Sequence, residues 1–394
     1  VEDVVVKEGF RQSMAWLHTW SGLLVGWVLL FVFITGTLGY FRAAIDDWMR
    51  PEQAQPLATE LVSIEQTRHA LQLTQQWLEA NALPAHYWYI EPPAHVGQPV
   101  DVEWQDSQGQ YHGRQLDAVT GQVLEPAAVE RVRETGGGTW LYRLHYQLHY
   151  LPEKLGNWIV GICSMFMLVA LISGIITHKK FFKDFFTFRP GKGQRSWLDA
   201  HNLAGVLALP FLLMITYSGL VMLVLLYMPW GADSAFKTPP ERQALFAQMS
   251  ALVPAGPPSG TRVPLAPVGD MFGQAETRWG KGQVGRVTVN NPGDAAARVV
   301  MVRGEDGRVS VSPRYLVFDG TNGRLLQEQD AVGPAAETRG VLYALHLGRF
   351  GDTVLRWLYF LVSLAGTAMV GTGLVLWTVK RRAKLPDPGR PYFG

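Results

Sequence analysis

The sequence predicts a polytopic α-helical membrane protein with four transmembrane helices. Most of its Leu, Val, Ile and Phe residues gather in four apolar runs, at residues 14–41, 155–178, 197–228 and 353–379. Each run reaches the roughly 20 residues that a helix needs to cross a bilayer core of about 30 Å. Between the runs lie two long polar segments with strand-like alternation. We therefore also expect two small extracytoplasmic α+β domains.

Composition limits the classes of function. The net charge of +2 does not indicate a nucleic-acid partner. The single cysteine, Cys163, lies in the second apolar run, so the chain has no internal disulfide and no CxxCH haem-attachment motif. The first apolar run is too long for a cleavable signal peptide and is typical of a signal anchor.

The distribution of Lys and Arg predicts the orientation. The loop between the second and third runs has one acid, Asp184, against six basic residues: Lys179, Lys180, Lys183, Arg189, Lys192 and Arg195. The C-terminal tail begins with Lys380, Arg381 and Arg382. Both segments belong in the cytoplasm by this rule, and so do the N- and C-termini. The two long polar segments then face the other side.

The elements follow in order. The predicted segments are a cytoplasmic lead and first helix (1–41), a polar domain (42–153), a second helix (154–180), a basic loop (181–196), a third helix (197–228), a second polar domain (229–350), a fourth helix (351–380) and a cytoplasmic tail (381–394). The first polar domain has a helix expected at 63–81 and strands at 87–90 and 100–104, and the second has strands expected at 286–289, 298–303 and 315–318.

Two parallel internal repeats are visible. His18, Gly22, Thr35 and Gly36 match His201, Gly205, Ser218 and Gly219 at a constant offset of 183 positions. The turn motifs at 117–124 (DAVTGQVL) and 319–326 (DGTNGRLL) match at an offset of 202. Leu141-Tyr142-x-Leu144-His145 matches Leu342-Tyr343-x-Leu345-His346 at an offset of 201. Parallel repeats imply a pseudo-two-fold axis along the membrane normal. This axis should bring His18 near His201 inside, and His145 near His346 outside.

Six of the ten histidines lie at the ends of the apolar runs. His18, His178 and His201 are at the inner ends, and His145, His149 and His346 at the outer ends. Imidazole ligates haem iron, zinc and copper, and a non-covalent b-type haem fits helices in a membrane best. The repeat-related four, His18, His145, His201 and His346, are the candidate ligands of haem or metal. His149 lies four residues after His145 and is expected on the same helix face. Neither His149 nor His178 has a repeat partner, so both are second choices.

Glycines near these histidines, including Gly36, Gly174, Gly219 and Gly373, either leave room for a flat ring or allow close helix packing. The chain lacks a Rossmann fingerprint and a P-loop. Without a flavin or nicotinamide site, the electrons for a haem pair must come from another molecule.

Four motifs resemble the PepSY-associated transmembrane helix family: WLHTWSG at 16–22, DAVTGQVL at 117–124, LYRLH at 141–145 and SGIITHKK at 173–180. Within that family the chain looks most like inner-membrane ferric-siderophore reductases of the ferrioxamine type. The resemblance covers nearly the whole chain, although the second PepSY-like unit is degenerate. It implies a bacterial inner-membrane location, periplasmic PepSY-like domains and two haem b groups. It carries over His18, His145, His201 and His346 as ligands.

The function expected from these observations is a di-haem electron-transfer protein that reduces siderophore-bound Fe(III) to Fe(II) at the periplasmic face and releases iron for uptake. Its partners would be the ferric siderophore, an unidentified membrane or cytoplasmic electron donor and the lipid bilayer. Two alternatives remain open: a non-catalytic PepSY sensor or assembly protein, and a histidine-lined metal transporter.

Overall fold

A computed structural model describes residues 9–51, 60–124, 133–178, 187–249, 253, 256–305 and 307–382 of the 394. The chain forms two compact units. The first contains residues 1–54, 133–235 and 342–394, and the second contains residues 55–132 and 236–341. Lys179, Lys180 and Lys183 of the basic loop and residues 383–394 of the predicted tail lie outside the described residues.

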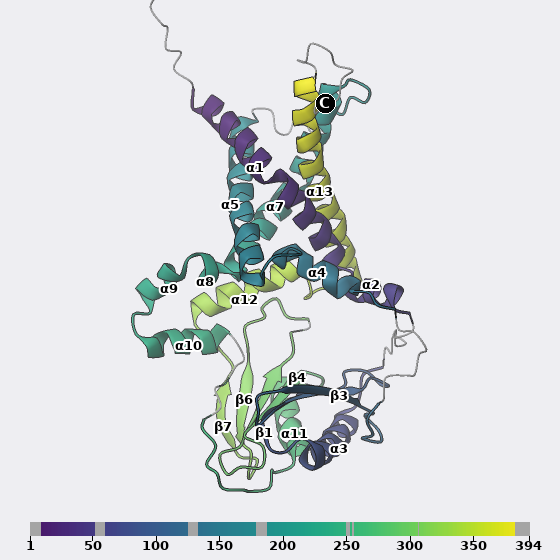
Figure 1. The fold of residues 1–394 in the computed structure, drawn as a ribbon, viewed down its shortest axis with the longest axis vertical. Helices are drawn as coiled ribbons and strands as arrows, with labels where there is room; N and C mark the ends of the chain where they lie inside the picture. Colours follow the sequence, from purple (N-terminus) through teal and green to yellow (C-terminus); the bar gives the residue numbers. More distant parts are fainter. Residues whose placement is uncertain are drawn as a thin grey trace, which may run out of the picture. The chain divides into compact units, whose positions relative to one another are not determined.

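The first unit is built on four long apolar helices: α1 (Phe10–Gly39), α5 (Glu153–Thr177), α7 (Gln194–Met222) and α13 (Thr353–Arg382). All four are long and apolar enough to cross a membrane, which confirms the prediction of four spans. The third helix ends at Met222 rather than near 228, because the backbone leaves helical geometry at Leu223 and a separate short helix, α8 (Val224–Tyr227), follows. In Figure 1 the start of α1 and the end of α13 lie at the same end of the bundle.

The four helices close into a ring in which α1 packs on α5 and α13, and α7 packs on the same two helices. Every one of the four helices contributes buried side chains to the apolar cluster between them, among them Leu29, Met167, Leu212 and Met369. The outer faces carry exposed apolar side chains, among them Trp27, Ile172, Leu207 and Leu361. A helix that is apolar on all sides is typical of a membrane span, because lipid replaces water at its outer face.

Short helices flank the bundle. They are α2 (Arg42–Met49), α4 (Gly137–Gln147), α9 (Pro229–Ala235) and α12 (Pro334–Leu347). Both copies of the LYxLH motif are helical, the first in α4 and the second at the end of α12. The helix α4 lies against α2, and a Cβ added to Gly138 would collide with the Arg42 carbonyl oxygen. Gly138 is therefore required for this close approach of two helices.

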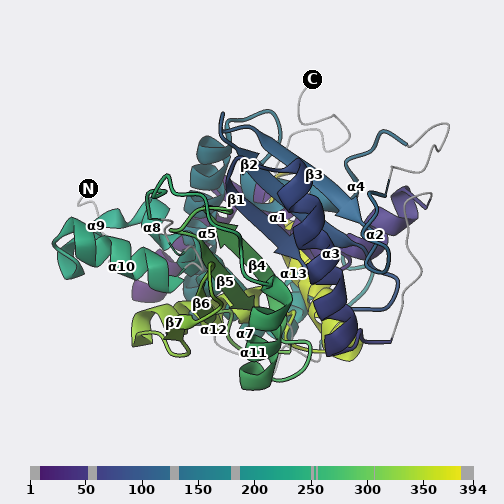
Figure 2. The same ribbon diagram turned by 90° about the horizontal axis from the view of Figure 1, so that it is seen from below.

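The second unit is one seven-stranded antiparallel sheet in the order β3-β2-β1-β4-β5-β6-β7 (Figure 2). Its strands are β1 (Ala85–Glu91), β2 (Val100–Asp106), β3 (Tyr111–Leu116), β4 (Val284–Asn290), β5 (Arg298–Arg303), β6 (Tyr315–Asp319) and β7 (Leu325–Gln329). The five strands expected from the sequence are all present, and β3 and β7 are additional.

The sheet corrects the expectation of two separate small domains. The strands β1 and β4 pair antiparallel, with Tyr87 opposite Asn290 and Ile90 opposite Val287. The two polar segments therefore share one hydrogen-bonded sheet, to which the first contributes a helix followed by three strands and the second a helix followed by four strands. Domain boundaries drawn at the ends of the spans also differ from the structure, because residues 42–51, 133–153, 229–235 and 342–350 belong to the helical unit.

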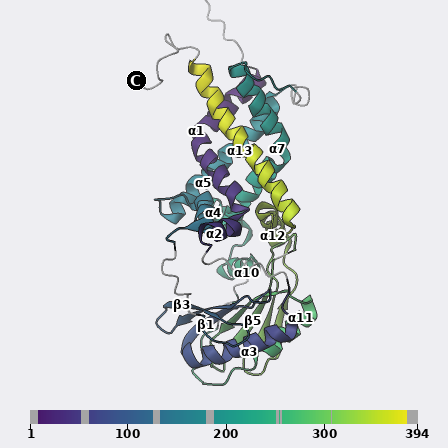
Figure 3. The same cartoon turned by 90° about the vertical axis from the view of Figure 1, so that its right-hand side faces the viewer.

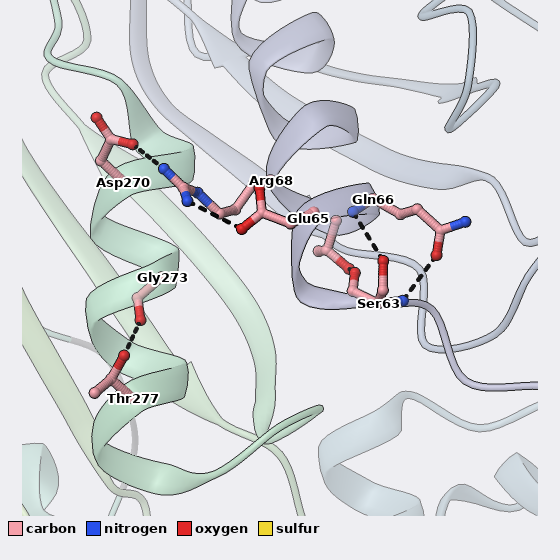
Figure 4. Close-up of polar contacts among 8 residues, drawn as sticks. Ser63, Glu65, Gln66, Arg68, Asp270, Gly273 and Thr277 are labelled. Atoms are coloured by element: carbon pink, nitrogen blue, oxygen red, sulfur yellow. Dashed lines mark hydrogen bonds and ion pairs between the residues drawn. The ribbon is translucent and has the colours of Figure 1, made fainter.

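Two helices, α3 (Ile64–Asn81) and α11 (Val268–Trp279), lie side by side on one face of this sheet (Figure 3). Ser63 caps α3 by accepting a hydrogen bond from the backbone of Gln66, so the helix expected at 63–81 begins where predicted. Arg68 of α3 forms an ion pair with Asp270 of α11 (Figure 4). The core between helices and sheet is apolar, and its fully buried members include Leu71, Trp88, Met271 and Phe318.

The two predicted turn motifs are confirmed as turns. The Asp117 carboxylate accepts hydrogen bonds from the backbone N–H groups of Val119 and Thr120 at 3.0 and 2.7 Å. The Asp319 carboxylate accepts one from the Thr321 N–H at 2.9 Å. Gly121 and Gly323 follow with φ of +70° and +71°, a left-handed conformation that glycine adopts without steric cost.

Candidate functional site: two histidine pairs in the helical bundle

The first pair is formed by His18 of α1 and His201 of α7, which occupy equivalent positions in the two sequence repeats. Their ring centroids are 6.1 Å apart and the rings are inclined at 65°. His18 Nδ1 lies 2.7 Å from the Ala170 carbonyl oxygen on α5, and His201 Nδ1 lies 2.8 Å from the Met369 carbonyl oxygen on α13. A carbonyl oxygen can only accept, so both Nδ1 atoms carry the proton and donate it. All four long helices thus position this pair.

The second pair joins His145 of α4 and His346 of α12. The ring centroids are again 6.1 Å apart, with the rings inclined at 46°. His145 Nδ1 donates to the Val32 carbonyl oxygen of α1 at 2.8 Å. His346 Nδ1 lies 3.0 Å from Ser218 Oγ of α7. The predicted pairing of His18 with His201 and of His145 with His346 is therefore confirmed.

Burial keeps the second pair neutral. Removal from water lowers the pKa of His145, and it lowers the pKa of His346 to about 3. Both rings are therefore neutral at pH 7, which is the form that has a lone pair available for a metal.

Each of the four rings packs against a glycine of a neighbouring helix. A Cβ atom on Gly36 would lie 2.6 Å from His145, one on Gly219 would lie 2.9 Å from His346, one on Gly174 would lie 3.0 Å from His18, and one on Gly373 would lie 3.1 Å from His201. Carbon atoms in ordinary contact are about 3.5–4.0 Å apart. These glycines were expected to make room for a flat ring or to allow close helix packing. The ring in contact with them is the imidazole itself.

The remaining two candidates lie apart from the pairs. The helix α4 ends at Gln147, and Leu148 and Tyr150 have φ of +58° and +64°, so the expectation that His149 shares a helix face with His145 is wrong. His149 is exposed and contacts the rings of Trp140 and Tyr150.

His178 follows the last residue of α5, and its backbone N–H donates to Gly174, the glycine that packs against His18. His178 therefore lies one helical turn beyond Gly174, the residue against which His18 of the first pair packs.

The geometry of the pairs suits two axial ligands on one iron. An imidazole nitrogen lies about 2.0 Å from a first-row metal and about 1.1 Å from its own ring centre, so two imidazoles on opposite sides of one metal have centroids about 6.2 Å apart. Within the described part of the chain, no hydrogen bond involves Nε2 of any of the four histidines. Each ring is thus held through Nδ1, with the Nε2 lone pair available as ligand.

Haem iron needs only these two protein ligands, because the porphyrin supplies the other four nitrogens. Across the described ranges, no group of three or more His, Cys, Asp or Glu side chains is placed to hold a metal ion. The residues present therefore fit haem iron.

The sequence reasoning missed the hydrogen-bond acceptors of the rings: the carbonyls of Val32, Ala170 and Met369 and the hydroxyl of Ser218. A partial signal was present. Ser218 and Gly219 formed part of the first repeat, and Ala170 and Met369 are separated by the same 199 positions as Gly174 and Gly373. Every residue has a backbone carbonyl, so the residue type does not indicate which carbonyl accepts a hydrogen bond, and only the fold shows it.

The fold and these contacts define a polytopic membrane protein with two histidine pairs, one near each end of a four-helix bundle. The chain belongs to the PepSY-associated TM region family, whose model matches residues 15–380. It is also 27% identical over 253 residues to an uncharacterized protein of Pseudomonas aeruginosa, PA4219. That match covers 59% of this chain and 61% of the relative, so the chain spans about three fifths of the relative's length.

Proposed function

We propose that this protein is a di-haem b membrane oxidoreductase that reduces siderophore-bound Fe(III) to Fe(II). The observation that carries the proposal is the pair of imidazole rings, found twice, with centroids 6.1 Å apart in both cases. His18 and His201 would hold one haem, and His145 and His346 the other. When bound, haem supplies one-electron oxidation and reduction between Fe(III) and Fe(II).

The side chains and backbone around each pair prepare it for that role. The Nδ1 hydrogen bonds fix the tautomer and the direction of each ring, so Nε2 is the atom presented to iron. The glycine behind each ring lets the imidazole lie directly on a neighbouring helix. Rings that are braced on both sides need little rearrangement when the charge on the metal changes, which favours electron transfer.

The two pairs are separated along the membrane. His18 and Gly36, the glycine that touches His145, are 18 positions apart on α1, and His201 and Gly219 have the same spacing on α7. At about 1.5 Å per residue this corresponds to roughly 27 Å, close to the thickness of a bilayer core. Two sites at this spacing support transfer of electrons from one membrane face to the other.

The substrate assignment rests on the charge distribution and on the family resemblance. The Lys/Arg bias supports an orientation with the sheet unit in the periplasm and both termini in the cytoplasm, and the family resemblance supports a bacterial inner membrane. Siderophore oxygens are hard ligands, which suit Fe(III) better than the softer Fe(II), so reduction at the periplasmic face would release the iron. The electron donor would be a separate membrane or cytoplasmic molecule.

The first test is the visible spectrum of the purified protein. We expect haem b, two per chain, with the spectrum of iron that has two histidine ligands. His145→Ala or His346→Ala should remove one haem, and His18→Ala or His201→Ala the other. A colourless preparation from haem-replete cells would favour a sensor or assembly protein, or a metal transporter, over the reductase.

The second test addresses direction. Sealed, oriented vesicles receive dithionite inside and ferric siderophore outside, and an impermeant chelator reports Fe(II). The unaltered protein should produce external Fe(II), and the His18→Ala, His201→Ala double variant should not. Equal Fe(II) production by both proteins would rule out an electron path that requires the first pair.

A further inference from the structure

Three of the four histidines donate their Nδ1 hydrogen bond to a backbone carbonyl oxygen, and His346 differs from them. Three Nδ1 atoms donate to backbone carbonyl oxygens at 2.7, 2.8 and 2.8 Å. The fourth, on His346, meets the Ser218 hydroxyl at 3.0 Å, the longest of the four bonds. By the offset of 183, the equivalent of the Val32 carbonyl used by His145 is the Ile215 carbonyl. That carbonyl also lies within hydrogen-bonding reach of His346.

The Ser218 hydroxyl contacts both His346 and this carbonyl. Ser218 Oγ lies 2.7 Å from the Met214 carbonyl oxygen and 3.2 Å from the Ile215 carbonyl oxygen of its own helix. Its proton is directed toward these carbonyls, so its oxygen accepts from His346 Nδ1. Ser218 is fully buried, and water does not replace this contact.

Thr35 occupies the equivalent position in the first half and behaves differently. Its hydroxyl lies 2.8 Å from the Phe31 carbonyl oxygen and 3.1 Å from the Val32 carbonyl oxygen. Within the described residues it makes no bond to His145, whose Nδ1 reaches the Val32 carbonyl directly. The two halves therefore differ in the atom that accepts the Nδ1 hydrogen bond of the histidine: a carbonyl oxygen for His145 and a hydroxyl oxygen for His346.

Such a difference changes how strongly the ligand favours oxidised iron. A strong hydrogen bond from Nδ1–H makes an imidazole more basic, and a more basic ligand stabilises Fe(III) over Fe(II). The bond from His346 is the longest of the four and ends on a hydroxyl rather than a carbonyl oxygen, which makes His346 the least basic of the four. We propose that Ser218 is a positioning residue that raises the reduction potential of the haem held by His145 and His346 above that of the haem held by His18 and His201.

This inference rests on the proposed function and deepens it, because the higher potential would lie at the site assigned to the periplasmic side. Electrons would then move toward the ferric substrate in the favourable direction. The difference arises from one side chain of α7.

The test is a spectroscopic redox titration of the full-length protein in detergent. The unaltered protein should titrate with two potentials, and the His18→Ala variant, which keeps only the second pair, assigns the upper one. In Ser218→Ala the Ile215 carbonyl is freed from the hydroxyl and accepts from His346. The upper potential should therefore fall by an amount that corresponds to roughly a tenfold change in the reduction equilibrium, about 59 mV for one electron.

Three controls separate this role from a structural one. Ser218→Thr keeps the hydroxyl and should keep the upper potential. Ser164→Ala removes a hydroxyl that bonds only the Val160 carbonyl of its own helix and should leave both potentials unchanged. The haem content of the two Ser218 variants and of the Ser164 variant should equal that of the unaltered protein. If Ser218→Ala leaves the upper potential unchanged, raises it, or shifts both potentials equally, the inference is wrong while two haems still support the proposed function. Absence of haem would instead refute the proposed function.

Discussion

The glycine that packs against His145 offers the sharpest test of how the site is built. In Gly36→Ala the new methyl group would lie 2.6 Å from both Cε1 and Nδ1 of His145. Ordinary contact requires about 3.5 Å, so the ring must move away from α1 by roughly 0.9 Å. The Nδ1 to Val32 oxygen distance, now 2.8 Å, would then lengthen by up to the same amount, to about 3.7 Å, at which no hydrogen bond remains.

The expected energetic cost follows from these two changes. Overpacking costs about 1–3 kcal/mol, and the lost hydrogen bond costs about 0.5–1.5 kcal/mol. The greater helix propensity of alanine returns about 1 kcal/mol. The net destabilisation is therefore about 0.5–3.5 kcal/mol, and the His145–His346 pair loses its alignment.

Gly371→Ala is the matched control, because the nearest atom to its new methyl group is Leu30 Cδ1 at an ordinary 3.7 Å. Thermal unfolding in detergent and haem content should both be measured. We expect Gly36→Ala to unfold at lower temperature and to lose the haem proposed for the His145–His346 pair, while Gly371→Ala keeps its haem content and unfolds at the same or a higher temperature. If the two variants unfold at the same temperature and retain equal haem, the packing of His145 on Gly36 has no role in the site.

Three further predictions concern the sheet unit. Gly121→Ala should destabilise it by about 1–2 kcal/mol in urea unfolding, because φ is +70° and the new methyl group would lie 2.9 Å from Leu73 Cβ. Hydrogen bonds from the Thr120 backbone and side chain lower the pKa of Asp117 below its usual 3.8. The Asp117 carboxylate should therefore stabilise the folded unit fully above pH 3.8. This stabilisation should be lost as the pH falls through the lowered pKa of Asp117. Asp117→Asn should unfold with a weaker dependence on pH between about 5 and 3, and an unchanged dependence would refute the assignment. Trp88 is fully buried and donates its indole N–H to the Ala82 carbonyl oxygen at 3.1 Å, so Trp88→Ala should cost about 3–5 kcal/mol, and a midpoint within error of the unaltered protein would contradict the described core.

Local sequence patterns determined much of this protein. Four apolar runs specify four helices of spanning length. In lipid, apolar side chains are favourable on every face of a helix, and the backbone groups find hydrogen-bond partners only within the helix. The constant offsets between repeated motifs were enough to pair His18 with His201 and His145 with His346. Asp117 and Gly121 specified a turn because a carboxylate that caps backbone N–H groups and a residue with positive φ are local requirements.

Only the tertiary structure decided how distant segments meet. Pairing of β1 with β4 joins strands about 200 residues apart. The pairing is made by backbone hydrogen bonds, so the side-chain sequence does not identify which two strands will pair. The position of His149 was decided by a backbone that turns to positive φ at Leu148 and ends α4. The acceptors of the four imidazoles are mostly carbonyl groups, which every residue possesses. The sequence could therefore name the histidines and their partners, but the direction in which each ring points, and the exception at Ser218, depend on packing between helices.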